Sequence, residues 1–99
     1  MTISTNQSGT TLTVSVSGRI DTTTAAQFET QVKSAIEGAK DVVFDFEKVD
    51  YVSSAGLRVL LSVQKIMKTK GDMKLIHVNE SVYEIFEVTG FTDILTIEQ

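Results

Sequence analysis

The sequence predicts a single α/β domain in which helices pack on a mixed, mostly parallel β-sheet. Residues 11–17 alternate apolar and polar side chains, as a strand with one buried face does. Residues 25–36 and 57–67 instead repeat their apolar side chains at helical spacing. Because strands and helices of this length alternate along only 99 residues, we expect parallel pairings within one domain.

An N-terminal hairpin opens the predicted sheet. We expect a short strand over residues 2–6, a turn at 7–9 and a second strand over 11–17. Gly18 is expected to end the second strand, and residues 19–21 are expected to lead into a loop.

The first helix is expected to open at residues 22–24. Thr24 and Gln27 have the spacing of a capping box, in which two side chains satisfy free backbone N–H groups. Gly38 is the expected C-cap. The apolar side of this helix carries Ala25, Phe28, Val32, Ala35 and Ile36.

A denser apolar run at 41–46 predicts a buried strand covered by helices, with Asp45 near its end. Residues 47–53 are interpreted as a loop, residues 54–69 as a helix and residues 70–72 as a turn. The apolar stripe of this helix is formed by Leu57, Leu60, Leu61 and Met67, widened by Val63 and Ile66.

Two strands and one helix complete the prediction. The strands cover residues 73–78 and 94–97. The helix between them is expected to start with a capping box of Ser81 and Glu84 and to close at Gly90. Its inward residues are expected to be Val82, Ile85 and Phe86.

Composition excludes several classes of function. The formal net charge of −4 argues against a nucleic-acid binder, which needs clustered Lys and Arg. A mild lysine cluster is interpreted as a solvated helix end and turn; it contains Lys65, Lys68, Lys70 and Lys74. The absence of cysteine excludes disulfides and thiol catalysis. Without a secretory signal or a membrane-spanning apolar run, we expect a cytoplasmic protein that does not bind membranes.

The stretch around two adjacent serines organises the chain. Ser53 and Ser54 precede Ala55–Gly56 and an apolar-periodic run, which is the pattern of a helix N-terminus. A phosphate placed there would meet free N–H donors at the positive end of the helix dipole. Arg58 lies one helical turn after Ser54 and adds a cation on that side.

These residues resemble the phosphorylation-site segment of STAS domains, the family of anti-sigma factor antagonists and sulfate-transporter tails. The common family form is Asp-Ser-Ser/Thr-Gly-Leu, in which the first serine is phosphorylated. With the alignment set on Gly56–Leu57, Ser54 takes the phosphoacceptor position. Ser53 then stands where the family has Asp, and Ala55 stands where it has the second hydroxyl residue. Ser53 is therefore a rival acceptor.

A second match lies upstream. Residues 18–22, Gly-Arg-Ile-Asp-Thr, are similar to the family's Gly-x-Leu/Ile-Asp element before its first helix. The order of strands and helices also matches from about residue 11 to residue 97. The resemblance implies one STAS-like domain over residues 1–99, with Asp21 near the phosphoserine loop.

Each candidate residue also has a structural interpretation. The serines can serve purely as helix caps, and Asp21 as a helix-entry cap. His77, the only histidine, is placed in a strand with a structural role, since one histidine makes no recognisable metal site. Position 52 is Val, so Ser54 lacks a nucleophile elbow. The acidic residues Asp45, Glu47 and Asp50 are interpreted as a solvated loop face and not as a catalytic pair.

The resemblance implies a phosphorylation-switched binding module without cofactor, metal or enzyme activity. Its expected partners are an anti-sigma factor with serine kinase activity and a protein phosphatase. Binding of the unphosphorylated form would release a sigma factor and so favour transcription. The residues expected at the docking site are Asp21, Ser53, Ala55, Gly56, Leu57 and Arg58. Alternatives are a small-ligand or nucleotide sensor, a component of a larger signalling assembly and a serine hydrolase.

The family usually has a further helix after its last strand, and this sequence stops at Gln99. We therefore expect part of the sheet surface to be exposed near Phe91, Ile94 and Ile97. Because exposed apolar patches mark interfaces, weak self-association is expected.

Overall fold

A computed structural model describes all residues from 1 to 99 and contains one five-stranded sheet with three α-helices. The strands lie in the order β1-β2-β3-β4-β5; β1 is antiparallel to β2, and the other neighbours are parallel. The predicted mixed, mostly parallel α/β fold is confirmed. The elements are β1 (Thr2–Ser8), β2 (Thr11–Ile20), α1 (Ala25–Ala35), β3 (Asp41–Val52), α2 (Ser54–Met67), β4 (Met73–Ile76), α3 (Glu80–Val88) and β5 (Thr96–Ile97), with 3₁₀ turns at Ile36–Gly38 and Phe91–Asp93.

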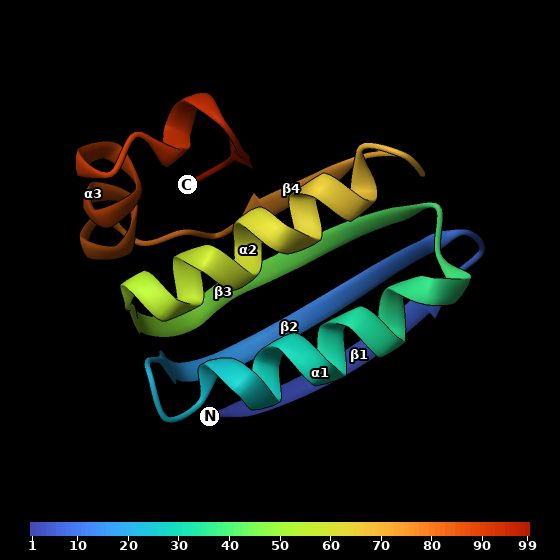
Figure 1. Cartoon of the computed structure of the whole chain (residues 1–99), viewed down its shortest axis with the longest axis horizontal. Coiled ribbons are helices and arrows are strands. Elements are labelled where there is room, and N and C mark those ends of the chain that lie inside the picture. The colour runs from blue at the N-terminus through green and yellow to red at the C-terminus, as the bar shows by residue number, and fades with distance from the viewer.

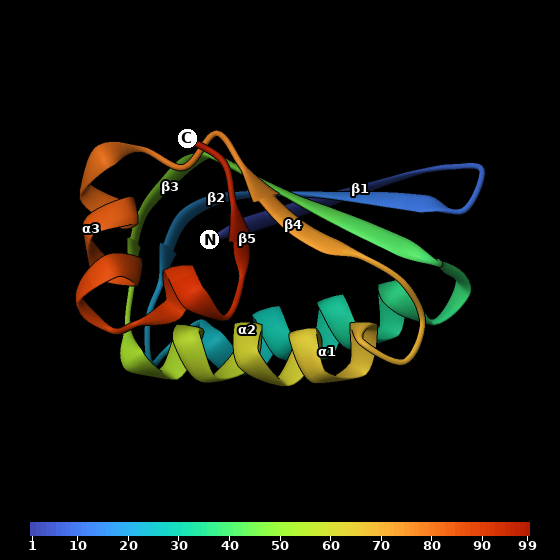
Figure 2. The same ribbon diagram turned by 90° about the horizontal axis from the view of Figure 1, so that it is seen from above.

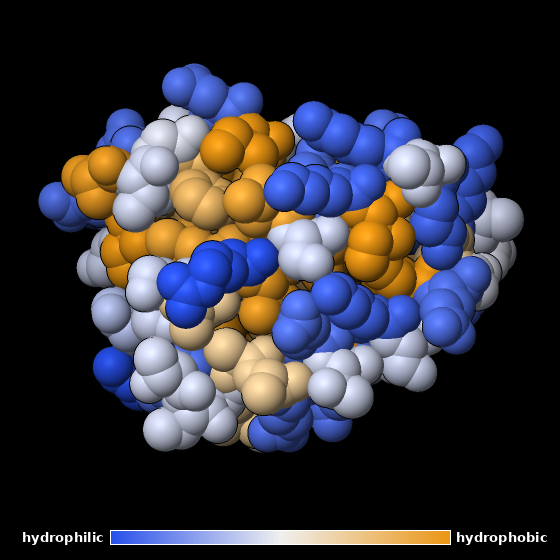
Figure 3. All heavy atoms as spheres, in the orientation of Figure 1, coloured by the Kyte–Doolittle hydropathy of each residue, from blue (hydrophilic) through white to orange (hydrophobic).

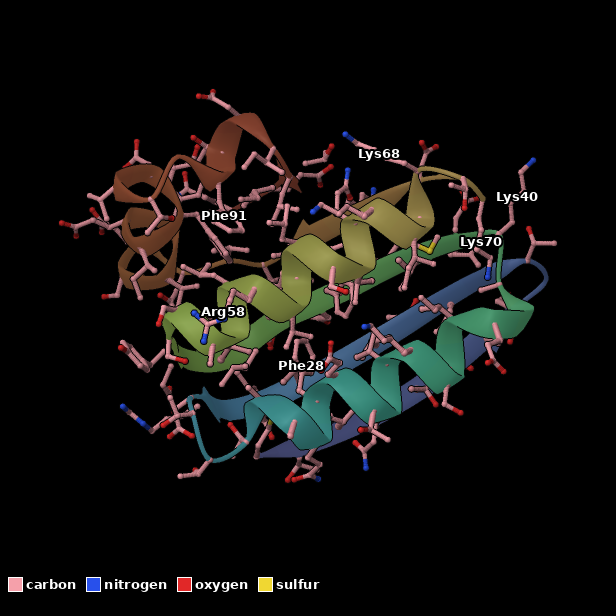
Figure 4. The ribbon with its side chains drawn as sticks, in the orientation of Figure 1. Phe28, Lys40, Arg58, Lys68, Lys70 and Phe91 are labelled. Atoms are coloured by element: carbon pink, nitrogen blue, oxygen red, sulfur yellow. The ribbon has the colours of Figure 1, made fainter.

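The helices cover one face of the sheet. Helices α1 and α2 run side by side along that face, and α3 stands at one end of it (Figures 1 and 2). Phe28 of α1 lies between the two long helices (Figure 4) and packs edge-to-face on Phe44, which meets Phe46 in the same way. These three rings are fully buried and form the centre of the core.

The opposite face of the sheet is open, which corrects the prediction that helices enclose β3. Buried and half-exposed residues alternate along Asp41–Phe46, so only one side of the strand is covered. Asp45 also lies inside the strand and not near its end. The apolar run is dense because Val43, which points to the open face, is apolar as well. Val43 is half-buried although no helix covers it.

Two predicted loops are strand. Gly18 does not end β2, which continues to Ile20, and the predicted loop 47–53 is strand as far as Val52. The two extensions pair with each other in parallel, with Ile20 opposite Val52. Shifts in the register interrupt this pairing, and Gly18 with φ 95° lies at one of them. Because the pairing is irregular and joins distant segments, these residues lack the simple apolar–polar alternation by which a strand is recognised in sequence.

Both predicted capping boxes are wrong. Helix α1 starts at Ala25 and not at residues 22–24; Thr24 is its N-cap, but its side chain makes no capping bond. Helix α3 is capped by Asn79, whose side chain accepts a hydrogen bond from Val82 N–H (2.9 Å). The Asn79 amide also donates to Val49 O (2.9 Å) on β3, so one side chain caps the helix and fastens it to the sheet.

Other end signals are partly corrected. Gly38 lies in the 3₁₀ turn after α1 and is not its C-cap, which is Ile36. Gly90 has a left-handed φ of 79° and follows α3 as predicted. His77 follows β4 and does not belong to it; its φ is 57°, a conformation outside the strand region.

Lys70 departs from the prediction of a solvated lysine cluster. It is half-buried, and its ammonium group donates hydrogen bonds to Ile36 O and Glu37 O at the end of α1. Figure 4 shows its side chain reaching from the end of α2 toward that turn. A cation here complements the negative end of the helix dipole and ties α1 to α2.

The C-terminal segment leaves part of its apolar surface exposed. Ile94 is 41% exposed, whereas Phe91 and Ile97 are half-buried against the core. Val88 on α3 is also exposed. Figure 3 shows apolar side chains gathered on the helix-bearing face near α3, among hydrophilic ones. None of the helices has both the length and the apolar character that crossing a bilayer requires.

Candidate functional site

The two sequence motifs meet at one end of the sheet, where β2 and β3 finish side by side (Figure 1). Ser53 N–H donates a 2.8 Å hydrogen bond to Ile20 O, which joins the end of β2 to the start of α2. The chain leaves β2 toward α1 and leaves β3 toward α2. The N-termini of both helices therefore lie at this end, as predicted.

The two serines have different environments. Ser53 is the N-cap of α2, is only 9% exposed, and accepts a hydrogen bond from Gly56 N–H with its Oγ (3.3 Å). Ser54 is the first residue of the helix and is exposed. Leu57 N–H bonds to Ser53 O, so the amides of Ser54 and Ala55 are the ones left without a helical partner. An anion carried by Ser54 would lie at this helix N-terminus, where these amides are free.

Gly56 permits the close approach of the two motifs. A Cβ at this position would lie 2.7 Å from Ile20 Cγ2, 3.0 Å from Ile20 O and 3.0 Å from Val52 Cγ1. Real side chains do not come this close, so only glycine fits without a shift. The first turn of α2 rests directly on the end of β2 for this reason. Gly56 and Leu57 are both buried.

Asp21 organises the entry to α1. Its Oδ1 accepts hydrogen bonds from Thr23 N–H (3.0 Å), the Thr23 hydroxyl (2.7 Å) and Thr24 N–H (3.2 Å). Thr24 in turn donates from its hydroxyl to Arg19 O (2.9 Å). The side chain therefore has the helix-entry role that we considered from sequence. Asp21 remains partly exposed and lies at the same end of the sheet as Ser54.

Asp21 should make stability depend on acid pH. The hydrogen bond from the Thr23 hydroxyl, with the others from Thr23 and Thr24, lowers the pKa of Asp21 from 3.8, against a raising effect of desolvation. A carboxyl group whose pKa is lower in the folded state stabilises the fold at pH values above its pKa in the unfolded chain. This stabilisation is lost as the pH falls through its pKa in the folded state. We expect Asp21→Asn to lower the melting temperature at neutral pH and to reduce its fall between about pH 5 and pH 2. Equal pH slopes for the variant and the wild type, measured by thermal melts, would contradict this.

Arg19 and Tyr51 belong to the same surface, although the sequence analysis did not select them. The Arg19 guanidinium carbon lies 4.5 Å from the centre of the Tyr51 ring, and Arg19 Nε lies 3.6 Å from Asp21 Oδ2. Both side chains are solvent-accessible, with Tyr51 37% exposed. The two residues are register partners in the β2–β3 ladder. The sequence would have indicated these two residues only if the continuation of the β2–β3 pairing past Gly18 had been known.

Arg58 and Ala55 lie on α2 beside Ser54. Arg58 is exposed on the outer side of the helix (Figure 4) and forms no ion pair. Ala55 is half-buried. This end of the molecule thus presents the Ser54 hydroxyl, the Arg58 guanidinium without an ion pair, and the Arg19–Tyr51–Asp21 group around a helix N-terminus.

The only histidine takes no part in this site. His77 is exposed, and its Nδ1 lies 3.1 Å from Asp45 Oδ1 in the middle of β3. Asp45 Oδ1 also accepts from Glu47 N–H (3.1 Å). The pair holds the segment after β4 against β3, so His77 contacts an acid but no serine. Glu47 and Asp50 are exposed as predicted, but they lie on β3 and not in a loop, and Asp45 is half-buried.

Comparison with known proteins matches this geometry to a family. The model of the STAS domain matches residues 2–99. BtrV of Bordetella bronchiseptica, described as an anti-sigma factor antagonist, is 35% identical over 82 residues, which is 81% of this chain and 71% of BtrV. The crystal structure of an anti-sigma factor antagonist from Mycobacterium paratuberculosis has a TM-score of 0.89 at 20% identity, covering 98% of this chain and 84% of the other.

The fold is also that of SpoIIAA from Bacillus. Its phosphorylated form matches with a TM-score of 0.74 at 15% identity, covering 99% of this chain and 92% of SpoIIAA. At such identities the likeness concerns the fold alone. The match of the family model over nearly the whole chain shows that this protein belongs to the STAS domain family.

Proposed function

We propose that the protein is a phosphorylation-switched anti-sigma factor antagonist. In its unphosphorylated form it binds an anti-sigma factor that is also a serine kinase, and a sigma factor is released. The kinase phosphorylates Ser54, which ends the binding, and a protein phosphatase restores it. The relation to BtrV, at 35% identity, supports the antagonist role.

One observation carries the choice of Ser54. Of the two adjacent serines, Ser54 is exposed at the first position of α2, while Ser53 is buried and occupied as the cap. A kinase must reach the hydroxyl oxygen that it modifies. The free backbone N–H groups at the start of α2 can donate hydrogen bonds to the new phosphate, so the modification leaves the fold intact.

Exposure divides the predicted docking residues into two groups. Arg58, Ala55 and Asp21 have accessible surface that a partner can contact. Ser53, Gly56 and Leu57 are buried and act by positioning the first turn of α2. We add Arg19 and Tyr51 to the contact group, because their stacked side chains are exposed beside Asp21.

The chemistry of the surface fits binding and not hydrolysis. A serine nucleophile needs a base within hydrogen-bond reach, and the one histidine is bonded to Asp45 instead. The phosphoryl group and its nucleotide belong to the partner kinase in this proposal, so the chain itself needs no cofactor.

Replacement of Ser54 by Asp tests the switch. About two negative charges on the docking surface would be opposed by repulsion and desolvation at a dry interface, and one carboxylate reproduces part of this. We expect Ser54→Asp to weaken partner binding by roughly tenfold to several hundredfold. A pull-down from lysate with wild type, Ser54→Asp and Ser54→Ala, analysed by mass spectrometry, should recover a kinase-type anti-sigma factor with the first and third only. Equal recovery with all three proteins would refute the switch.

Weak self-association is also part of this proposal. The exposed Ile94, with Phe91 and Ile97 beside it, offers a smaller apolar surface than the sequence suggested, because the last two are half-buried, so this surface is not proposed as the site of contact. A strictly monomeric sedimentation profile at high concentration would count against any self-association.

A further inference from the structure

Strand β1 forms one edge of the sheet and has no neighbour on its outer side (Figures 1 and 2). Six of its seven residues are exposed, and only Ile3 is partly buried. Its ladder with β2 is regular over all seven residues, from Thr2 opposite Ser17 to Ser8 opposite Thr11. In an antiparallel ladder only alternate residues bond to the neighbouring strand, so the others point their N–H and C=O groups toward the free edge.

This edge lacks the features that usually protect an edge strand. Such strands are kept apart by charged side chains, proline, bulges or short length. The 22 charged residues of the chain all lie between Arg19 and Glu98, so residues 2–18, which include all of β1 and most of β2, carry no charged side chain. The sequence contains no proline, and β1 has no bulge. A seven-residue strand with free hydrogen-bonding groups is therefore open to pairing.

The neighbouring helix adds little charge to this side. Helix α1 lies over the β1 side of the sheet (Figure 1), and its only charged residues, Glu29 and Lys33, pair with each other at 2.8 Å. Its exposed residues are uncharged; they are Ala26, Gln27, Thr30, Gln31 and Ser34. The net charge of −4 thus resides elsewhere and opposes contact between copies through other surfaces.

We infer that the free edge of β1 joins two copies of this chain, with β1 of each copy antiparallel to β1 of the other. Centred on Thr5, the pairing places Thr5 opposite its own copy, Ser4 opposite Asn6 and Thr2 opposite Ser8. The same register places Ile3 opposite Gln7, so every pair is uncharged, and the backbone pattern is self-complementary about a two-fold axis. The two sheets become one continuous sheet of ten strands.

The size and position of β1 also determine how strong this contact is and that it does not involve Ser54. One pair of strands buries less than the roughly 1,200 Å² of a standard stable interface, so a weak, concentration-dependent dimer is expected. Ser54 follows β3, which is separated from the free edge by β2. Both copies keep their phosphorylation sites accessible, and Ser54→Asp should leave dimerisation unchanged.

Sedimentation velocity over a concentration series tests this surface. We expect wild type to shift from monomer toward dimer, and Thr5→Lys to raise the dimer dissociation constant at least roughly tenfold, since two like charges then face each other. Ile94→Lys is the matched control: it adds a positive charge at the apolar C-terminal surface and should dimerise like wild type. Circular dichroism verifies that each variant folds.

Mixing charge variants provides a second, independent measurement. Thr5→Lys and Thr5→Glu should each stay monomeric alone and associate when mixed at low salt, because opposite charges then meet at the two-fold axis. A purely monomeric wild type, loss of the dimer in Ile94→Lys with retention in Thr5→Lys, or no association in the mixture would each overturn the proposal.

Discussion

Ser54→Ala is expected to abolish phosphate incorporation by the partner kinase while leaving the fold and partner binding intact. The hydroxyl oxygen that receives the phosphoryl group is removed, and alanine adds neither charge nor bulk at an exposed position. The cap of α2 is Ser53, so we expect a loss in stability within about 0.5 kcal/mol. Phosphopeptide mapping after incubation with the kinase measures incorporation, and urea denaturation measures stability.

Ser53 variants are the matched controls for this result. Ser53→Ala removes the oxygen that accepts from Gly56 N–H and should cost about 1 kcal/mol, with Ser54 still phosphorylated. Ser53→Asp retains a capping oxygen and restores the family's Asp at this position, so phosphorylation should be at least as fast. Stoichiometric phosphate on Ser53 that persists in Ser54→Ala would show that the acceptor is the other serine.

Gly56→Ala is expected to produce the largest loss of stability among the variants of the site. The new Cβ would be 3.0 Å from the Ile20 carbonyl oxygen and closer still to Ile20 Cγ2. A backbone oxygen cannot rotate away, so the first turn of α2 must move off the end of β2. We expect a loss of about 1–3 kcal/mol in the free energy of unfolding, the usual cost of overpacking. The shift should also weaken binding of the partner, because it moves Ser54 relative to Asp21.

Gly38→Ala is the control for this prediction. Nothing lies within 4 Å of a Cβ at Gly38, and its φ is not in the left-handed region. The same chemical change should therefore be neutral or slightly stabilising, by up to about 1 kcal/mol, through the unfolded chain. Urea midpoints compare the two variants directly. Equal stability for Gly56→Ala and Gly38→Ala would refute the close contact between α2 and Ile20.

The sequence predicted features that depend on a few neighbouring residues. Alternation at 11–17 follows from burying one face of a strand and was recovered in full. The helical stripe of α2 was recovered except that Val59 is buried and the predicted Leu61 is half-exposed. The serines before α2 were located at its start for the same reason. Thr24 and Ser81 were misjudged because another side chain nearby, Asp21 or Asn79, satisfies the free amides at those helix entries.

Other features required contacts between distant parts of the chain. Pairing of Ile20 with Val52 turned two predicted loops into strand, and it also brought Arg19 over Tyr51. His77 has a φ of 57° outside the strand region, and its ring lies 3.1 Å from Asp45, which is far away along the chain. None of these contacts has a signal within a window of a few residues.

The sequence by itself determined the order of the strands and helices and that a serine pair begins α2, since periodicity and capping act over one or two turns of chain. Only the tertiary structure decided that Ser53 is buried and Ser54 exposed, that Gly56 must be glycine, and that β1 is left with a free edge. Burial and strand order depend on which distant segments pack together. The end of β2, for example, lies more than thirty residues before α2, the helix that rests on it.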